Sequence, residues 1–222
     1  MTKLIPYQMY VHFRYRAIHW PDMPASRRKG AQLAIPKEGL LDTFADLDDR
    51  PDFTEIRCGW NDHGIGFSFL LPAFDRKKAT ILLDQPTSST GISLWLDTRG
   101  DRTGHRATRT CHHFHIFPFG PEDDTPSVGA FRIARALVDA PLPNTENLIL
   151  HCTPQQSSQL WEIFLPATEL SGYHPAEFST CGVFWRINHH TDTQLAGTTE
   201  EYPYDNDPSL WHSLELVPPA KS

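Results

Sequence analysis

Residues 91–117 read GISLWLDTRGDRTGHRATRTCHHFHIF and hold two strand-like runs joined by a polar connection rich in arginine. In the first run Ile92, Leu94 and Leu96 alternate with other residues, which is the period-two pattern of a β-strand. The second run, residues 111–117, alternates in the same way. No other segment places so many side chains able to bind a ligand or take part in catalysis between two sheet-forming runs. We therefore expect the functional part of the chain here.

Alternation divides the second run between the two faces of a strand. Phe114 and Ile116 share one face and, being apolar, mark it as the core side. We therefore expect His113 and His115, on the opposite face, to point away from the core. If the two runs pair in one sheet, a single polar and aromatic surface is formed by Trp95, Asp97, His113 and His115.

Strand patterns continue on both sides of this stretch. Residues 53–60 and 65–71 alternate, and the turn-forming residues 61–64 between them predict a β-hairpin that ends at Pro72. Other segments with strand character are 10–15, 77–85, 144–152, 160–165, 180–187 and 210–217. Segments expected to be irregular or helical are a short helix or turn in 39–52, a helix or strand in 130–138, two helical turns in 166–178 and a polar loop in 188–209.

Proline content supports short strands with many connections. Of 222 residues, 19 are proline, above the usual share of about 5%. The predicted fold class is all-β: a two-sheet, mostly antiparallel β-sandwich of jelly-roll or immunoglobulin-like type, with short helical turns in its connections. We expect one domain over residues 33–222, preceded by an N-terminal segment, residues 1–32, that packs on it.

Composition excludes several classes of protein. The formal net charge is −7, which disfavours general binding to nucleic acid or to anionic lipid. No segment approaches the roughly 20 apolar residues of a membrane span, and the N-terminus has no signal-peptide core, so we expect no membrane contact and a cytoplasmic location. The four cysteines are widely spaced without a CxxC pair, which predicts reduced and mostly buried thiols.

Several motifs occur together in a familiar order. A hairpin with Trp60 and Gly64 is followed by GISLWLDTR (91–99), PATELSGYHPAEF (166–178), CGVFWRIN (181–188) and DPSLW (207–211). Over about residues 33–217 the chain resembles the family 9 carbohydrate-binding modules and the wider DOMON-like β-sandwich group. The continuation HRATRTCHHFHIFP is similar to a branch of that group found mostly in bacteria.

This resemblance implies two sheets packed face to face and no catalytic centre. Members of the family hold a sugar end between two tryptophan side chains, helped by charged and amide groups, and others in the wider group bind haem through Met and His. The three methionines of this chain lie near the N-terminus, outside the matching strands, which argues against haem.

The leading functional hypothesis is a non-catalytic module that binds a carbohydrate or a similar polyhydroxylated or small polar ligand. Such a site needs a flat aromatic ring and planar polar groups that bond bidentately. The candidate ligand-binding residues are Trp95, Asp97, Arg99, Arg106, Trp60 and Trp185. For each tryptophan the alternative is packing in the core, and for Asp97 and Arg99 a local ion pair.

A second hypothesis is a metal-binding protein or metal-dependent enzyme. His113 and His115 stand one residue apart, which places their imidazoles about 6.5 to 7 Å apart along one face of a strand. They would bind a divalent metal if His105, Asp97 or Cys111 supplied a third ligand. The alternative is a pair of histidines hydrogen-bonded in a polar sheet surface. Apart from this divalent metal, zinc or calcium, no cofactor is expected, and no hydrolase motif occurs.

A third hypothesis is a structural or protein-interaction module. In that case the arginine-rich connection, residues 98–110, would act as a docking surface.

Overall fold

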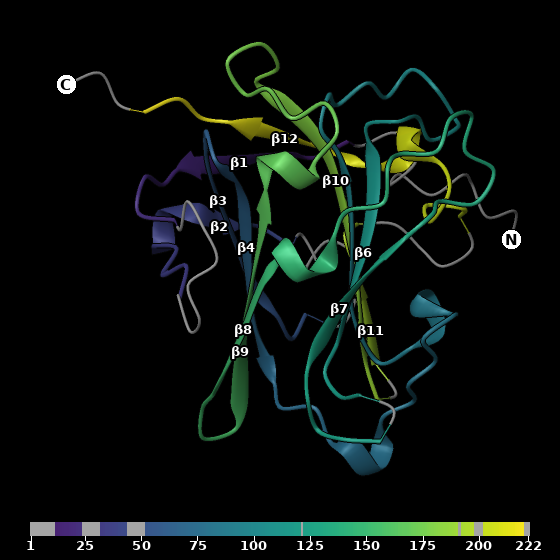
Figure 1. Ribbon diagram of the computed structural model, residues 1–222. Helices are drawn as coiled ribbons and strands as arrows, with labels where there is room; N and C mark the ends of the chain where they lie inside the picture. Colours follow the sequence, from purple (N-terminus) through teal and green to yellow (C-terminus); the bar gives the residue numbers. More distant parts are fainter. Residues whose placement is uncertain are drawn as a thin grey trace, which may run out of the picture.

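The computed structural model describes residues 12–23, 32–43, 52–120, 122–190, 192–197 and 202–219. Twelve strands make up the described part, which contains short 3-10 turns and no α-helix. Figure 1 shows the strands gathered into two layers, with long connections around them. Among the residues that the structure describes, no helix has the length and apolar character needed to cross a membrane.

The strands follow one another through connections of very different length. Their bounds are β1 Arg14–His19, β2 Leu40–Leu41, β3 Glu55–Asn61, β4 Gly64–Pro72, β5 Gly91–Asp97, β6 Cys111–Phe117, β7 Ser127–Phe131, β8 Ile149–Pro154, β9 Ser158–Pro166, β10 Thr180–His189, β11 Asp192–Leu195 and β12 His212–Leu216. The 3-10 turns are η2 Lys37–Gly39, η4 Arg76–Lys78, η5 Pro86–Ser88, η6 Thr145–Asn147, η7 Ala167–Glu169 and η8 Pro208–Leu210.

Strand β1 joins the two layers of the sandwich. One layer has the order β7-β6-β5-β10-β12 and the other β3-β4-β9-β8, with β11 beside β10 and β2 beside β3. Residues 14–17 of β1 pair with β12, while Ile18 and His19 pair with β3, both in parallel. All other pairings are antiparallel. The predicted all-β, mostly antiparallel sandwich is confirmed, and the shared β1 makes it one mixed sheet nearly closed into a barrel-like shape.

The predicted hairpin of residues 53–72 is confirmed as β3 and β4. Its turn places Asn61 opposite Gly64, and the Asn61 side chain accepts a hydrogen bond from the His63 backbone N–H at 2.9 Å. Tyr173 locks the turn, since its hydroxyl donates toward the carbonyl oxygens of Asn61 and Gly64 at 3.1 and 3.0 Å. A Cβ at Gly64 would lie 2.3 Å from the carbonyl oxygen of Leu165, so glycine is required.

Glu162 on β9 holds the segment that follows residue 31. Its Oε1 accepts from the backbone N–H groups of Leu33 and Ala34 at 3.0 and 3.1 Å. Burial raises the pKa of this carboxyl group, and the two backbone hydrogen bonds lower it in part. The segment therefore docks on β9 through this buried carboxyl group and through the apolar cluster of Leu33 and Ile35 with Phe164.

Several local predictions differ from the structure. Residues 77–85 contain no strand: the backbone N–H groups of Thr80 and Leu82 donate to the hydroxyls of Thr90 and Ser89, so side chains replace a neighbouring strand. Residues 188–209 are more than a loop, because they include β11 and η8.

Other elements occur near their expected positions with shifted bounds. The strand expected at 10–15 is β1 at 14–19, inside the predicted N-terminal segment, and the strand within 144–152 begins only at Ile149, after η6. Residues 130–138 contain only the end of β7, and 39–43 contain β2, while 44–51 lie outside the described residues. Residues 166–178 contain η7 and a second turn, in which Glu177 and Phe178 donate to the carbonyl of His174.

All four cysteines are free thiols, three of them buried, as predicted from their spacing. Desolvation raises the pKa of Cys111 and Cys181 to about 12, so both remain protonated. They pack in the core as small apolar side chains.

Candidate functional site

The two runs of the quoted stretch pair as β5 and β6. The register places Trp95 opposite His113 and Ser93 opposite His115. The rings of Trp95 and His113 stack with centroids 4.4 Å apart and planes 7° apart. The predicted shared face is therefore confirmed.

That face is covered rather than open. Trp95 and His115 are 0% exposed and His113 is 6% exposed. Tyr204 packs edge-on to Trp95 at 5.7 Å, and Phe131 lies 5.5 Å from His113. The histidines lie on the face opposite Phe114 and Ile116, but this face is buried, because Phe131 of the neighbouring strand β7 and Tyr204 of the connection before β12 cover it.

Both histidines are neutral and engaged with other groups. His115 Nδ1 lies 2.8 Å from the Ser93 hydroxyl, and its Nε2 lies 3.4 Å from the carbonyl oxygen of Thr90. Burial lowers the pKa of each histidine to about 3, and for His113 the proximity of His115 contributes to this lowering. A proton on either ring would be a buried charge without a carboxylate partner.

The metal hypothesis gains no third ligand from the structure. His105 is exposed, and its Nδ1 lies 3.1 Å from the Asp207 carboxylate. Within the part of the chain that the structure describes, no three His, Cys, Asp or Glu side chains are grouped to hold a metal ion. His113 stacks on Trp95 and His115 is hydrogen-bonded to Ser93, while Nε2 of His113 is buried without a hydrogen-bond partner among the described residues.

The three candidate tryptophans do not meet in a cleft. Trp95 and Trp185 lie on opposite faces of one layer, because Trp185 pairs with Leu94 in the register of β5 and β10. Trp185 is 0% exposed and packs on Tyr15 at 5.1 Å. Trp60 is also buried and donates from Nε1 to the carbonyl of Val217 at 3.0 Å. All three stabilise the core.

Asp97 organises the connection that leaves β5. Its Oδ1 accepts from the backbone N–H of Arg99 at 3.1 Å and from the Thr110 hydroxyl at 2.8 Å. Burial raises the pKa of this carboxyl group, although its hydrogen bonds act in the opposite direction. Asp97 thus closes the two ends of the arginine-rich connection and lies beneath the surface.

The arginines of this connection fall into two groups. Arg106 donates to the carbonyls of Arg135 and Ala136 at 2.8 and 3.0 Å, and Arg102 donates to the carbonyl of Trp211 at 3.4 Å. These two hold neighbouring segments together.

Arg99 and Arg109 form the second group. The Arg99 guanidinium lies 4.5 Å above the ring of Phe178. Within the described chain, neither guanidinium makes a hydrogen bond or an ion pair.

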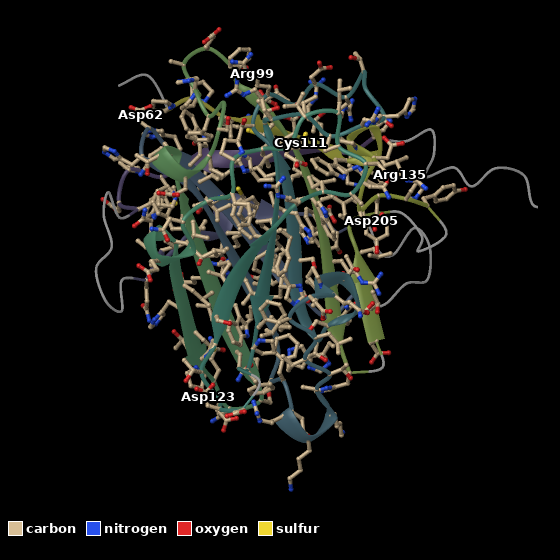
Figure 2. The ribbon with its side chains drawn as sticks, turned by 45° about the vertical axis from the view of Figure 1, so that its right-hand side comes forward. Asp62, Arg99, Cys111, Asp123, Arg135 and Asp205 are labelled. Atoms are coloured by element: carbon tan, nitrogen blue, oxygen red, sulfur yellow. The ribbon has the colours of Figure 1, made fainter. Side chains whose placement is uncertain are left out.

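An open pocket of about 500 Å³ lies where these two arginines emerge, and we call it the arginine pocket. Its lining residues are Arg99, Asp101, Thr108, Arg109, Thr110, Ser171, Gly172 and His174. Figure 2 shows Arg99 at one end of the sandwich, its side chain directed away from the sheets. A volume of this size is within the usual range for small-molecule sites.

The floor of the arginine pocket is built from two connections that are far apart in sequence. Thr98 donates from its hydroxyl to the carbonyl of Ser171 at 2.7 Å. Gly172 has φ +83°, and a Cβ there would lie 2.7 Å from Thr110 and 2.8 Å from Thr98. Glycine is therefore required for the close contact between the connection after β5 and the connection after β9.

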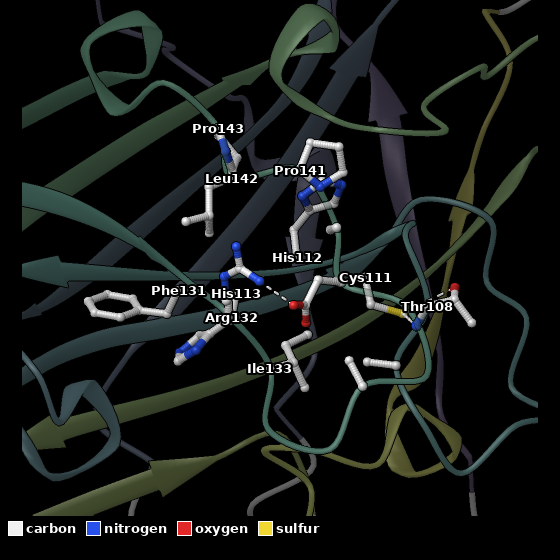
Figure 3. Close-up of a pocket in the computed structure, with 14 residues that line it drawn as sticks. Thr108, Cys111, His112, His113, Phe131, Arg132, Ile133, Pro141, Leu142 and Pro143 are labelled. Atoms are coloured by element: carbon white, nitrogen blue, oxygen red, sulfur yellow. Dashed lines mark hydrogen bonds and ion pairs between the residues drawn. The ribbon is translucent and has the colours of Figure 1, made fainter.

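A second pocket lies at the edge strand β7 (Figure 3) and is too small for a sugar ring. Its free space is about 10 Å³, which is the room of about one water molecule. His112, His113 and Phe131 are among its lining residues. Of these two pockets, only the arginine pocket has room for a sugar ring.

Sequence reasoning identified one member of the arginine pocket, Arg99. The other seven lining residues were not predicted as site residues: Asp101, Thr108, Arg109, Thr110, Ser171, Gly172 and His174. Arg109 belongs to the arginine-rich connection, residues 98–110, but no feature of the neighbouring sequence distinguishes it from Arg106. Ser171 and His174 belong to the motif in 166–178, which showed turn composition without indicating where the turn docks.

Comparison with solved structures identifies the fold. A family 9 carbohydrate-binding module from Caldicellulosiruptor kristjanssonii in complex with cellotriose superposes with a TM-score of 0.57 at 12% identity, covering 95% of this chain and 100% of that one. A module of the same family and organism in complex with glucose gives a TM-score of 0.56 at 10% identity, covering 95% and 98%. No protein-family model and no curated protein sequence matches the chain.

These superpositions define the class of fold: a β-sandwich of the family 9 carbohydrate-binding module type. The resemblance expected from the sequence motifs is thereby confirmed for the fold over nearly the whole chain.

Proposed function

We propose that this protein is a non-catalytic carbohydrate-binding module and that the arginine pocket holds the sugar. The observation that carries the proposal is the likeness in fold, over 95% of the chain, to modules solved with glucose and with cellotriose. The pocket adds an open site with polar lining at one end of that fold.

The lining suits a polyhydroxylated ligand. Guanidinium groups present several N–H donors in one plane and bond bidentately to neighbouring oxygens. The hydroxyls of Thr108 and Ser171 and the carboxylate of Asp101 add groups that accept from sugar hydroxyls. The pocket therefore offers both donors and acceptors to a single ring.

Aromatic stacking by tryptophan does not belong to this proposal. Trp60, Trp95 and Trp185 are all buried, so their ring faces already contact protein. Polar contacts in the arginine pocket supply the recognition instead.

The test is calorimetric titration with glucose and cellotriose, preceded by a glycan array to widen the panel. Arg99→Ala and Arg109→Ala should each weaken binding, by about tenfold where a bidentate contact is lost. Arg132→Ala is the matched control, because Arg132 is an exposed arginine that pairs with Asp139 and lies outside the arginine pocket. The proposal fails if the wild type binds no saccharide, or if both pocket variants bind as tightly as the control.

A further inference from the structure

We infer that the saccharide recognised by the arginine pocket is anionic, with a carboxylate or a phosphate ester that lies between Arg99 and Arg109. This inference rests on the proposed function, since it assigns the charge of the ligand in the same pocket. It starts from the contrast between the whole chain, with a net charge of −7, and this pocket, where two guanidiniums line one cavity.

Some arginines of the described chain are paired and others are not, and two of the unpaired ones line this one pocket. Arg57, Arg76 and Arg132 each pair with a carboxylate. Arg99 and Arg109 are exposed and both line the arginine pocket, and neither pairs with a carboxylate among the described residues. Two like charges at one cavity repel each other, and a bound anion replaces that repulsion with two charge-assisted contacts.

Arg99 is also pre-positioned for an anion. The contact with Phe178 covers a face of its guanidinium, and a cation over a ring leaves the in-plane N–H groups available. The backbone N–H of Arg99 is fixed by Asp97 beneath it. Less conformational entropy is therefore lost when Arg99 binds a ligand.

The acidic groups nearby do not neutralise the pair directly. Asp97 is 2% exposed, and its carboxylate is occupied by Thr110 and the backbone of Arg99. Asp101 lies in solvent, and its Oδ1 accepts from the backbone N–H and the hydroxyl of Thr103 at 3.1 and 2.7 Å. Among the described residues neither carboxylate makes an ion pair with Arg99 or Arg109, although Asp101 also lines the pocket and carries a negative charge there.

The experiment titrates the full chain with D-glucose, D-glucuronate and D-glucose 6-phosphate, and separately with acetate and inorganic phosphate. We expect at least one of the two anionic sugars to bind about tenfold or more tightly than glucose. We expect this preference to decrease as sodium chloride is added. Whichever of glucuronate and glucose 6-phosphate binds more tightly identifies the anionic group as carboxylate or phosphate.

Substitutions test whether the two arginines cause the preference for an anionic sugar over glucose. Arg99→Ala and Arg109→Ala should each abolish most of the preference for the anionic sugar, while Arg99→Lys, which keeps the charge, should retain part of it. Arg132→Ala should bind like the wild type. Circular dichroism and thermal melting of each variant separate a lost contact from a lost fold.

Three outcomes contradict the inference in distinguishable ways. If glucose or cellotriose binds and the anionic sugars bind no tighter, the charge assignment is wrong while the carbohydrate-binding proposal stands. If inorganic phosphate or acetate binds as tightly as the anionic sugars, the pocket binds a simple anion and the sugar is not recognised. If no compound binds, both the inference and the proposed function fail.

Discussion

We predict that buried histidines make the stability of this protein steeply dependent on pH below neutrality. Burial lowers the pKa of His113 and His115 to about 3 and that of His212 to about 4, against an ordinary value of 6.5. Each of these rings binds fewer protons in the folded protein than in the unfolded chain. Their contribution to stability is therefore complete above pH 6.5 and is lost as the pH falls from 6.5 toward the folded values.

The magnitude follows from proton linkage. Between pH 7 and pH 5 a histidine whose pKa falls from about 6.5 to about 3 on folding removes about 2 kcal/mol from the free energy of unfolding. The three histidines together remove about 6 kcal/mol, which is comparable to the whole stability of many domains. The raised pKa values of Asp97 and Glu162 act in the opposite direction, because those carboxyl groups take up protons more readily in the folded state.

A single variant isolates one histidine from the rest. His113→Phe keeps a ring against Trp95 and Phe131 and removes the titrating group. Its stability at pH 7 should lie within about 1.5 kcal/mol of the wild type. Its loss between pH 7 and pH 5 should be smaller than that of the wild type by about 2 kcal/mol.

The assay is urea unfolding followed by tryptophan fluorescence at pH 7, 6 and 5 at constant ionic strength. Phe131→Leu is the control, since it changes the packing against His113 without removing a titrating group and should keep the slope of the wild type. If His113→Phe and the wild type lose the same free energy over this interval, His113 is not buried in a neutral state and the reasoning is refuted.

Three further predictions concern stability and use the same unfolding assay. Gly172→Ala should destabilise the fold by about 1 to 3 kcal/mol, because the positive φ and the two threonine contacts leave no room for a Cβ. In the control Gly104→Ala the new Cβ meets only one carbonyl oxygen at 3.8 Å, so stability should change by less than about 0.5 kcal/mol. Equal effects of the two substitutions would contradict the docking of the two connections. Tyr173→Phe should cost about 1 to 2 kcal/mol, since the buried hydroxyl donates to the β3–β4 turn, and an unchanged midpoint would show that this hydroxyl contributes nothing. Glu162→Ala should cost about 2 to 3 kcal/mol through two backbone donors left without an acceptor, while Glu162→Gln, which keeps an oxygen, should cost less; the reverse order would be inconsistent with the described hydrogen bonds.

Local pattern in the sequence determined the β3–β4 hairpin and the two strands β5 and β6, together with their faces. The hairpin of residues 53–72 and the alternation in 91–97 and 111–117 are properties of neighbouring residues, because successive side chains of a strand point to opposite sides. That periodicity was enough to place Trp95 and His113 on one face and Phe114 on the other. The order of motifs also indicated the family 9 type of fold, which the superpositions confirm.

Only the tertiary structure decided what lies against each face. The alternation of side chains distinguishes the two sides of a strand, but it carries no information on segments that return from elsewhere in the chain. Tyr204, which covers Trp95, is more than a hundred residues away in the sequence. For the same reason the arginine pocket was invisible in the sequence: Arg99 and Arg109 become neighbours of Ser171 only when Gly172 allows two distant connections to touch. The stretch from 91 to 117 thus supplies the centre of one sheet, while the connection between its two strands contributes to the pocket that we propose as the ligand site.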